Sequence, residues 1–102
     1  MNKLTIVSYM FASYDHLKKT CNTQKIREFV LVLYDMCDIF LTKESSKNMK
    51  SNINKAISKL EMNDNKLIDF IDKLFYFRNM IIELAKIKHK MNENELCDLI
   101  KN

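Results

Sequence analysis

The chain of 102 residues contains no glycine and no proline, and this double absence limits what it can fold into more than any residue it does contain. Glycine lets a backbone turn tightly or approach a ligand closely, as phosphate loops, dinucleotide-binding turns and nucleophile elbows require. Two-residue β-hairpins also depend on turns such as Asn-Gly or Gly-X. The sequence therefore excludes the usual forms of those enzyme classes and favours an all-α fold.

Apolar residues recur at helical spacing in five successive stretches, at about residues 6–21, 26–40, 49–60, 67–90 and 92–100. A chain of this length fits one domain. We expect residues 1–102 to form a single helical domain, an antiparallel helical bundle of four main helices plus a short C-terminal helix.

The junctions between these stretches carry polar residues that can cap helices. Residues 20–23 offer a cap for the second stretch, and the serines of residues 42–46 offer one for the third. The run Asn63-Asp64-Asn65 supplies turn and cap chemistry before the fourth. Asn92 with Glu95 three residues later resembles a capping box, which predicts where the last helix begins.

The compartment is suggested by three cysteines and by the absence of long apolar runs. Cys21, Cys37 and Cys97 are odd in number and widely spaced, which favours reduced thiols over a disulfide framework. Runs such as residues 29–34 are far shorter than the ~20 residues that cross a bilayer. Although residues 3–12 imitate a short signal peptide, no small-x-small cleavage pattern follows them. We expect a cytoplasmic protein, of the producing cell or of an infected host cell.

Residues that could carry catalysis or bind a metal are thinly spread. His16 and His89 lie far apart, and neither follows a glutamate at the Glu-x-x-His spacing of di-iron bundles. Two carboxylate pairs fall on the polar sides of their predicted helices, Asp35 with Asp38 and Asp69 with Asp72. We expect no enzyme activity, no catalytic residue, no metal site and no cofactor.

One short motif resembles a known family. The stretch from Arg78 to Glu83 resembles the Arg-Asn-x-x-x-His signature of the HEPN ribonucleases and toxins, which are helical bundles. Glu83 stands where the signature has its histidine, the residue on which that chemistry depends. The resemblance covers six residues and implies no ribonuclease activity, so the chain is assigned to no family.

A lysine-rich segment is the first of two pointers to function. This segment contains five lysines and a single acid, Glu44. The lysines lie on the side of the third predicted helix opposite its apolar residues: Lys43, Lys47, Lys50, Lys55 and Lys59. Such a face can bind a phosphate backbone or an anionic membrane surface. The segment contains no arginine for bidentate contacts and no aromatic residue for base stacking. A merely solvated lysine face is the alternative.

The second pointer is the fourth stretch, where Arg78 falls in the middle of an apolar arc. A buried guanidinium needs a partner. Arg78 therefore either pairs internally, with Asp15 or Glu93 as the best candidates, or extends to solvent at the edge of the bundle, or meets an acidic group across an interface. Further apolar residues widen the arc and predict a homodimer seam or a partner groove: Phe70, Phe77, Met80, Leu84 and Ile87.

These features favour a small non-enzymatic protein-binding module, of the inhibitor, antitoxin, immunity or host-antagonist type. Lysine, asparagine and isoleucine are abundant, a bias that indicates an A+T-rich bacterium, mobile element or virus. A protein partner is expected, and a homodimer is possible. The alternatives are a nucleic-acid-binding protein that uses the lysine face and peripheral association with an anionic membrane.

Overall fold

The computed structural model describes residues 2–62 and 66–102, and every regular element in these two ranges is an α-helix. The all-α prediction is therefore confirmed for the described residues. The helices in chain order are α1 (Lys3–Phe11), α2 (Tyr14–Thr20), α3 (Thr23–Phe40), α4 (Lys43–Met62), α5 (Leu67–His89) and α6 (Glu93–Lys101).

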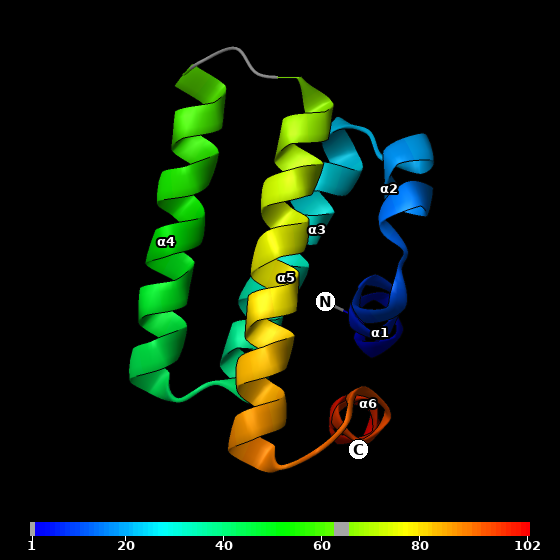
Figure 1. Cartoon of the computed structure of the whole chain (residues 1–102), viewed down its shortest axis with the longest axis vertical. Helices are drawn as coiled ribbons and strands as arrows, with labels where there is room; N and C mark the ends of the chain where they lie inside the picture. Colours follow the sequence, from blue (N-terminus) through cyan, green and yellow to red (C-terminus); the bar gives the residue numbers. More distant parts are fainter. Residues whose placement is uncertain (1, 63–65) are drawn as a thin grey trace.

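The three long helices α3, α4 and α5 contact one another and form the centre of the molecule. In Figure 1, α4 lies at the left edge and runs antiparallel to α5 beside it, while the short helices gather on the opposite side. There α1 packs against α3 and α6, and both α2 and α6 pack against α5. Because α1 and α6 are seen nearly end-on in Figure 1, the predicted antiparallel bundle of four main helices is not confirmed.

The first predicted stretch, residues 6–21, is wrong as a single helix. The chain leaves the helical conformation at Ala12, which is extended, and the Ser13 side chain accepts a hydrogen bond at 3.1 Å from the backbone N–H of His16. Serine is a strong N-cap because its oxygen satisfies a donor that the new helix leaves unpaired. The break lets α1 pack on α3 while α2 packs on α5.

Side-chain oxygens also cap the beginnings of α3, α4 and α6, whereas α5 begins after Lys66 without a side-chain cap. Asn22 caps α3, and Asn92 caps α6 in a reciprocal capping box with Glu95, as predicted. The predicted serine cap of α4 is wrong, because the Thr42 hydroxyl accepts from the Ser45 N–H at 3.2 Å while Ser46 lies inside the helix. The predicted junction at residues 63–65 lies outside the described residues.

The C-terminal ends of the helices lack the glycine that usually ends a helix in the left-handed conformation. After α5, Lys90 takes that conformation itself, with φ of 55°. At the end of α3, two side chains of α5 reach the carbonyl of Phe40: Lys88 Nζ donates to it at 3.4 Å, and His89 Nε2 lies 3.1 Å away. Cationic side chains interact favourably with the unpaired carbonyls of a helix C-terminus. Side chains of α5 therefore contact the carbonyl group at the C-terminal end of α3.

The core lies where α3 faces the other helices, and it is built mainly from fully buried side chains of α3, α4 and α5. The largest of these are Phe29, Leu33, Met36, Phe40, Ile53, Ile71, Leu74 and Ile81. All three cysteines are buried free thiols. Within the two described ranges, no helix combines the length and the apolar character that crossing a membrane requires.

Candidate functional site

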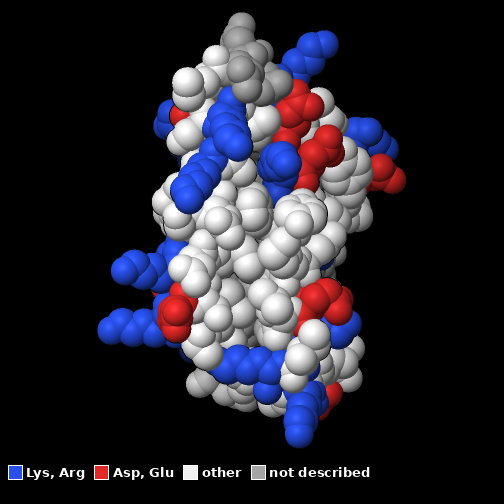
Figure 2. Space-filling view, turned by 60° about the vertical axis from the view of Figure 1, so that its left-hand side comes forward, with Lys and Arg blue, Asp and Glu red and all other residues white. Residues whose placement is uncertain are grey.

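The outer side of α4 presents the predicted lysine face. Met49 and Ile53 are buried on the inner side of this helix, so the lysines point away from the core. Figure 2 turns this edge of the molecule toward the viewer and shows Lys and Arg side chains projecting along its left, upper and lower margins. Lys50 is half-buried. The other four predicted lysines are exposed: Lys43, Lys47, Lys55 and Lys59.

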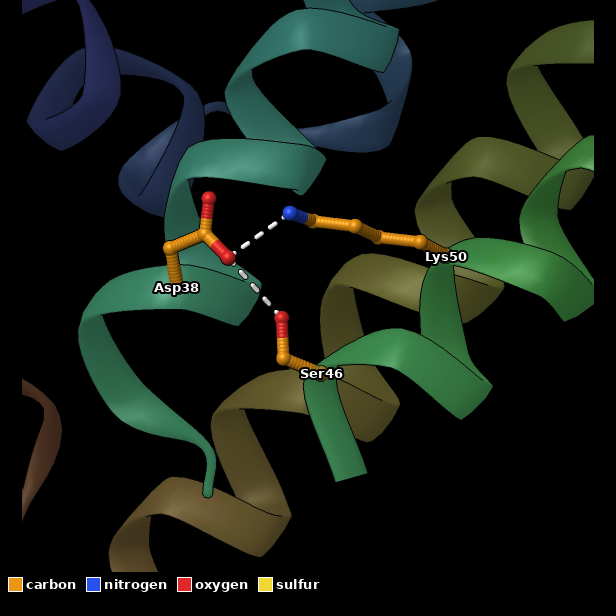
Figure 3. Close-up of polar contacts among 3 residues, drawn as sticks. All are labelled: Asp38, Ser46 and Lys50. Carbon is orange, nitrogen blue, oxygen red and sulfur yellow. Dashed lines mark hydrogen bonds and ion pairs between the residues drawn. The ribbon is translucent and has the colours of Figure 1, made fainter. Parts of the chain in front are cut away.

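Lys50 differs from the other four because it is paired inside the molecule. Its Nζ lies 2.7 Å from Oδ1 of Asp38 on α3, and the Ser46 hydroxyl donates to the same oxygen at 3.0 Å, as Figure 3 shows. The hydrogen bond from Lys50 holds the pKa of the Asp38 carboxyl below its ordinary value, and the same bond raises the pKa of Lys50. Lys50 therefore joins α4 to α3.

The lysine face is hollowed along α4. A shallow depression of about 540 Å³ is lined only by residues of this helix, and none of them is a carboxylate: Lys47, Lys50, Ser51, Asn54, Lys55, Ser58 and Lys59. Hydroxyl, amide and ammonium groups all donate hydrogen bonds, which suits an anionic ligand. The Asn54 side-chain oxygen already accepts a bond from the Tyr34 hydroxyl of α3.

A second hollow, of about 310 Å³, lies between α4 and α5 and brings in a lysine that the sequence reading did not single out. Lys73 of α5 lines it together with Lys55 and Lys59 of α4, beside Asn52, Ala56 and Leu60. We call these three lysines the lysine triad. All three are exposed, and none forms an ion pair within the described part of the chain. The sequence did not predict Lys73 as part of the lysine face, because its proximity to α4 depends on how α4 and α5 pack.

An exposed apolar stripe continues from Lys73 along α5. Tyr76 is 55% exposed, Leu84 42% and Ile87 74%, with the half-buried Met80 between them. At 100° per residue, these four positions and Lys73 fall within an arc of about 80° on the helix. We call Tyr76, Met80, Leu84 and Ile87 the α5 stripe. Figure 2 shows a broad uncharged region in the middle of this side of the molecule.

The predicted apolar seam thus divides into an exposed and an internal part. Met80, Leu84 and Ile87 belong to the α5 stripe, whereas Phe77 is buried in the core. Phe70 is half-buried and lines a separate hollow with Arg27 of α3. Tyr76 was missed, although its spacing of four, eight and eleven residues from the other members was a readable signal.

Arg78 lies on another side of α5, where it is only 8% exposed. Its Nη2 donates a hydrogen bond to the carbonyl of Met10 in the last turn of α1. The guanidinium carbon lies 4.4 Å from the centre of the Phe75 ring, a cation–π arrangement. Burial lowers the pKa of Arg78, and the charge of Glu93 opposes that shift. The Nε of Arg78 is also buried and has no hydrogen-bond partner in the described part of the chain.

The same side of α5 holds the start of α2. The Tyr14 ring meets the Phe75 ring edge-on at 5.6 Å, and the Tyr14 hydroxyl donates to Asp72. Arg78, Phe75 and Asp72 therefore fix the break between α1 and α2 on α5. The predicted carboxylate partner of Arg78 is replaced by a backbone carbonyl, which the sequence reading could not find because it missed the end of α1.

The described residues hold no group of three or more His, Cys, Asp or Glu side chains that could bind a metal ion. Comparison with known proteins adds no relative: no family model, no curated protein and no solved structure matches the chain. The function is therefore argued from the surfaces described above.

Proposed function

We propose that this protein is a non-enzymatic protein-binding module and that its partner docks on the surface shared by α4 and α5. The observation that carries this proposal is the α5 stripe, whose large apolar side chains face solvent next to the lysine triad. Contiguous exposed apolar groups with a polar rim are typical of protein interaction sites. Tyrosine is a frequent energetic anchor at such sites.

The placement of Arg78 supports the choice of this surface over the other side of α5. The guanidinium is used within the chain, on the Met10 carbonyl and the Phe75 ring, so it is not presented to a partner. The module acts, on this proposal, by occupying a partner's surface in the cytoplasm, as inhibitors, antitoxins and immunity proteins do.

The proposal is tested by site-specific photo-crosslinking in the source cell. A photoreactive amino acid at position 87 should capture a partner, because Ile87 is the most exposed member of the α5 stripe. The same group at position 19 is the matched control, since Lys19 is exposed on α2, away from this surface. Capture at position 19 but not at position 87 contradicts the proposal.

Nucleic-acid binding is the second candidate, supported by the 540 Å³ depression that lysines line without a carboxylate. The substitutions Lys47→Gln, Lys55→Gln and Lys59→Gln remove three of its charges and leave the Lys50–Asp38 pair intact. If this candidate is right, the variant binds all duplex and single-stranded sequences more weakly, and its affinity depends less steeply on salt. The absence of a mobility shift by the parent protein at low salt rejects it.

A further inference from the structure

The α5 stripe is long enough to contact a short helix that lies parallel to its axis. From Tyr76 to Ile87 the α5 stripe covers twelve residues, which is about 16 Å of helix axis or three turns. Within it Met80 is half-buried, and Tyr76, Leu84 and Ile87 are exposed. A straight apolar strip of this length accepts the row of side chains at positions i, i+3, i+4 and i+7 of an amphipathic helix.

The lysine triad places positive charge at one side of the stripe. The lysine triad lines the hollow between α4 and α5, no carboxylate lines that hollow, and none of the three ammonium groups is neutralised by an ion pair in the described residues. A ligand that covers the stripe and reaches α4 therefore gains by presenting carboxylates along its flank.

From this combination we propose that the partner segment is an acidic amphipathic helix. Its apolar face lies along the α5 stripe, and its carboxylates face Lys55, Lys59 and Lys73. The inference rests on the function proposed above and names the chemistry of the partner at the same surface.

A second copy of this chain fits the surface less well. Two α5 helices that pair antiparallel through the stripe bring Lys73 of one copy opposite Lys90 of the other, and a parallel pair brings Lys73 against Lys73. Each copy also adds its own α4 lysines to the same interface. Like charges at an interface disfavour association. An anionic bilayer also matches the charge, and the vesicle experiment below distinguishes it from a peptide.

The test uses three fluorescein-labelled helical peptides with one apolar pattern and with Glu, Gln or Lys on their flanks. Fluorescence anisotropy should show the Glu peptide binding at least about tenfold more tightly than the Lys peptide, with the ratio falling as salt rises. The protein variant Lys55→Glu, Lys59→Glu, Lys73→Glu should reverse this preference. The variant Ile87→Ser should weaken the binding of the Glu peptide without changing the order of the three.

The matched control reverses three exposed lysines that lie away from the surface: Lys3→Glu, Lys19→Glu and Lys101→Glu. This variant has the same net charge as the lysine-triad variant and should keep the parent's preference for the Glu peptide, apart from a uniform weakening. Thermal unfolding followed by circular dichroism checks that every variant is folded. We expect each to be folded, because all the substituted side chains are exposed.

Several results overturn the inference. Equal binding of the Glu and Lys peptides does so, and so does equal loss of the preference in both charge-reversed variants. Dimerisation that Ile87→Ser abolishes assigns the stripe to a second copy instead. Sedimentation with phosphatidylserine vesicles that requires Ile87 assigns it to a membrane. If position 87 captures a partner in cells while no Glu peptide binds, only this inference fails; if the Glu peptide binds but position 87 captures nothing, the proposed function fails.

Discussion

Two cations on α5, Lys73 and Arg78, are five residues apart in sequence and occupy opposite kinds of environment. Arg78 is almost completely buried, donates to the Met10 carbonyl and stacks on Phe75. Lys73 is exposed and has no ion-pair partner in the described residues. Five residues correspond to about 140° around a helix, so one charge faces α1 and the other faces the hollow beside α4. Position on the helix decides what each charge can do.

The two environments separate a charge that stabilises the fold from one that remains available for binding. Removing a buried cation strands the carbonyl and ring that it contacts, whereas removing an exposed cation leaves nothing unpaired. The free energy of unfolding should therefore depend on Arg78 and not on Lys73. Binding should show the reverse dependence.

The largest expected effect is that of Arg78→Met, which keeps an apolar stem and removes the guanidinium. We expect the free energy of unfolding to fall by about 2 kcal/mol, because the Met10 carbonyl becomes a buried acceptor without a donor. Urea denaturation followed by circular dichroism measures the change. The chain's other arginine is the matched control: Arg27 is exposed, so Arg27→Met should change stability by less than about 0.5 kcal/mol. Equal effects of the two substitutions contradict the assigned role of Arg78.

A smaller effect is expected at the end of α3, where Lys88 reaches the Phe40 carbonyl. Lys88→Met removes a cation from a helix C-terminus and should lower the free energy of unfolding by about 0.5 to 1 kcal/mol at low salt. The loss should shrink at high salt because such interactions are screened. A loss as large as that of Arg78→Met would show that a partly exposed cation stabilises the fold as much as the buried one.

The ion pair of Asp38 with Lys50 should contribute less, because the Asp38 side chain is exposed and the Lys50 side chain is only half-buried. The folded-state pKa of Asp38 is depressed, so its contribution is fully present above the unfolded pKa of about 3.9 and is lost as the pH falls through the folded value. We expect Asp38→Asn to lower stability at neutral pH by less than about 1 kcal/mol. The difference from the parent protein should vanish in acid. A difference that persists at about pH 2 shows that it does not arise from the carboxylate charge.

The smallest expected effect is that of Lys55→Gln, Lys59→Gln and Lys73→Gln on stability. The free energy of unfolding should stay within about 0.5 kcal/mol of the parent value, because these side chains are exposed and form no ion pair with any residue that the structure describes. A clear rise in stability indicates repulsion among the three ammonium groups and sharpens the case that they await an anionic partner. A clear loss indicates that they support the packing of α4 on α5.

Much of the fold could be predicted from local pattern. The apolar spacing of Ile26, Leu33 and Phe40 gave α3, and Asn92 with Glu95 gave the start of α6, since both signals lie within one helix. The break at Ala12 could not be read, because the apolar spacing of Ile6, Met10 and Leu17 continues across it. Ser13 was the only local signal for it.

The candidate site divides in the same way. The α4 lysines and most of the α5 stripe were visible as faces of single helices. The groove that joins Lys73 to Lys55 and Lys59 depends on the packing of α4 against α5, which no local pattern specifies. The partner of Arg78 likewise required knowing that α1 ends beside α5. The apolar and charge patterns of single helices did not predict these contacts, because each joins helices that are far apart in sequence.

The most direct test of the account is urea denaturation with and without the Glu-flanked peptide, carried out on the parent, on Arg78→Met and on the variant in which Lys55, Lys59 and Lys73 are changed to Gln. A ligand that binds only the folded state raises its stability in proportion to affinity and concentration. We expect the peptide to stabilise the parent and Arg78→Met by the same increment and to stabilise the lysine variant much less. An undiminished increment in the lysine variant, or an increment lost in Arg78→Met while that variant remains folded, would show that the lysine triad does not bind the peptide or that Arg78 does.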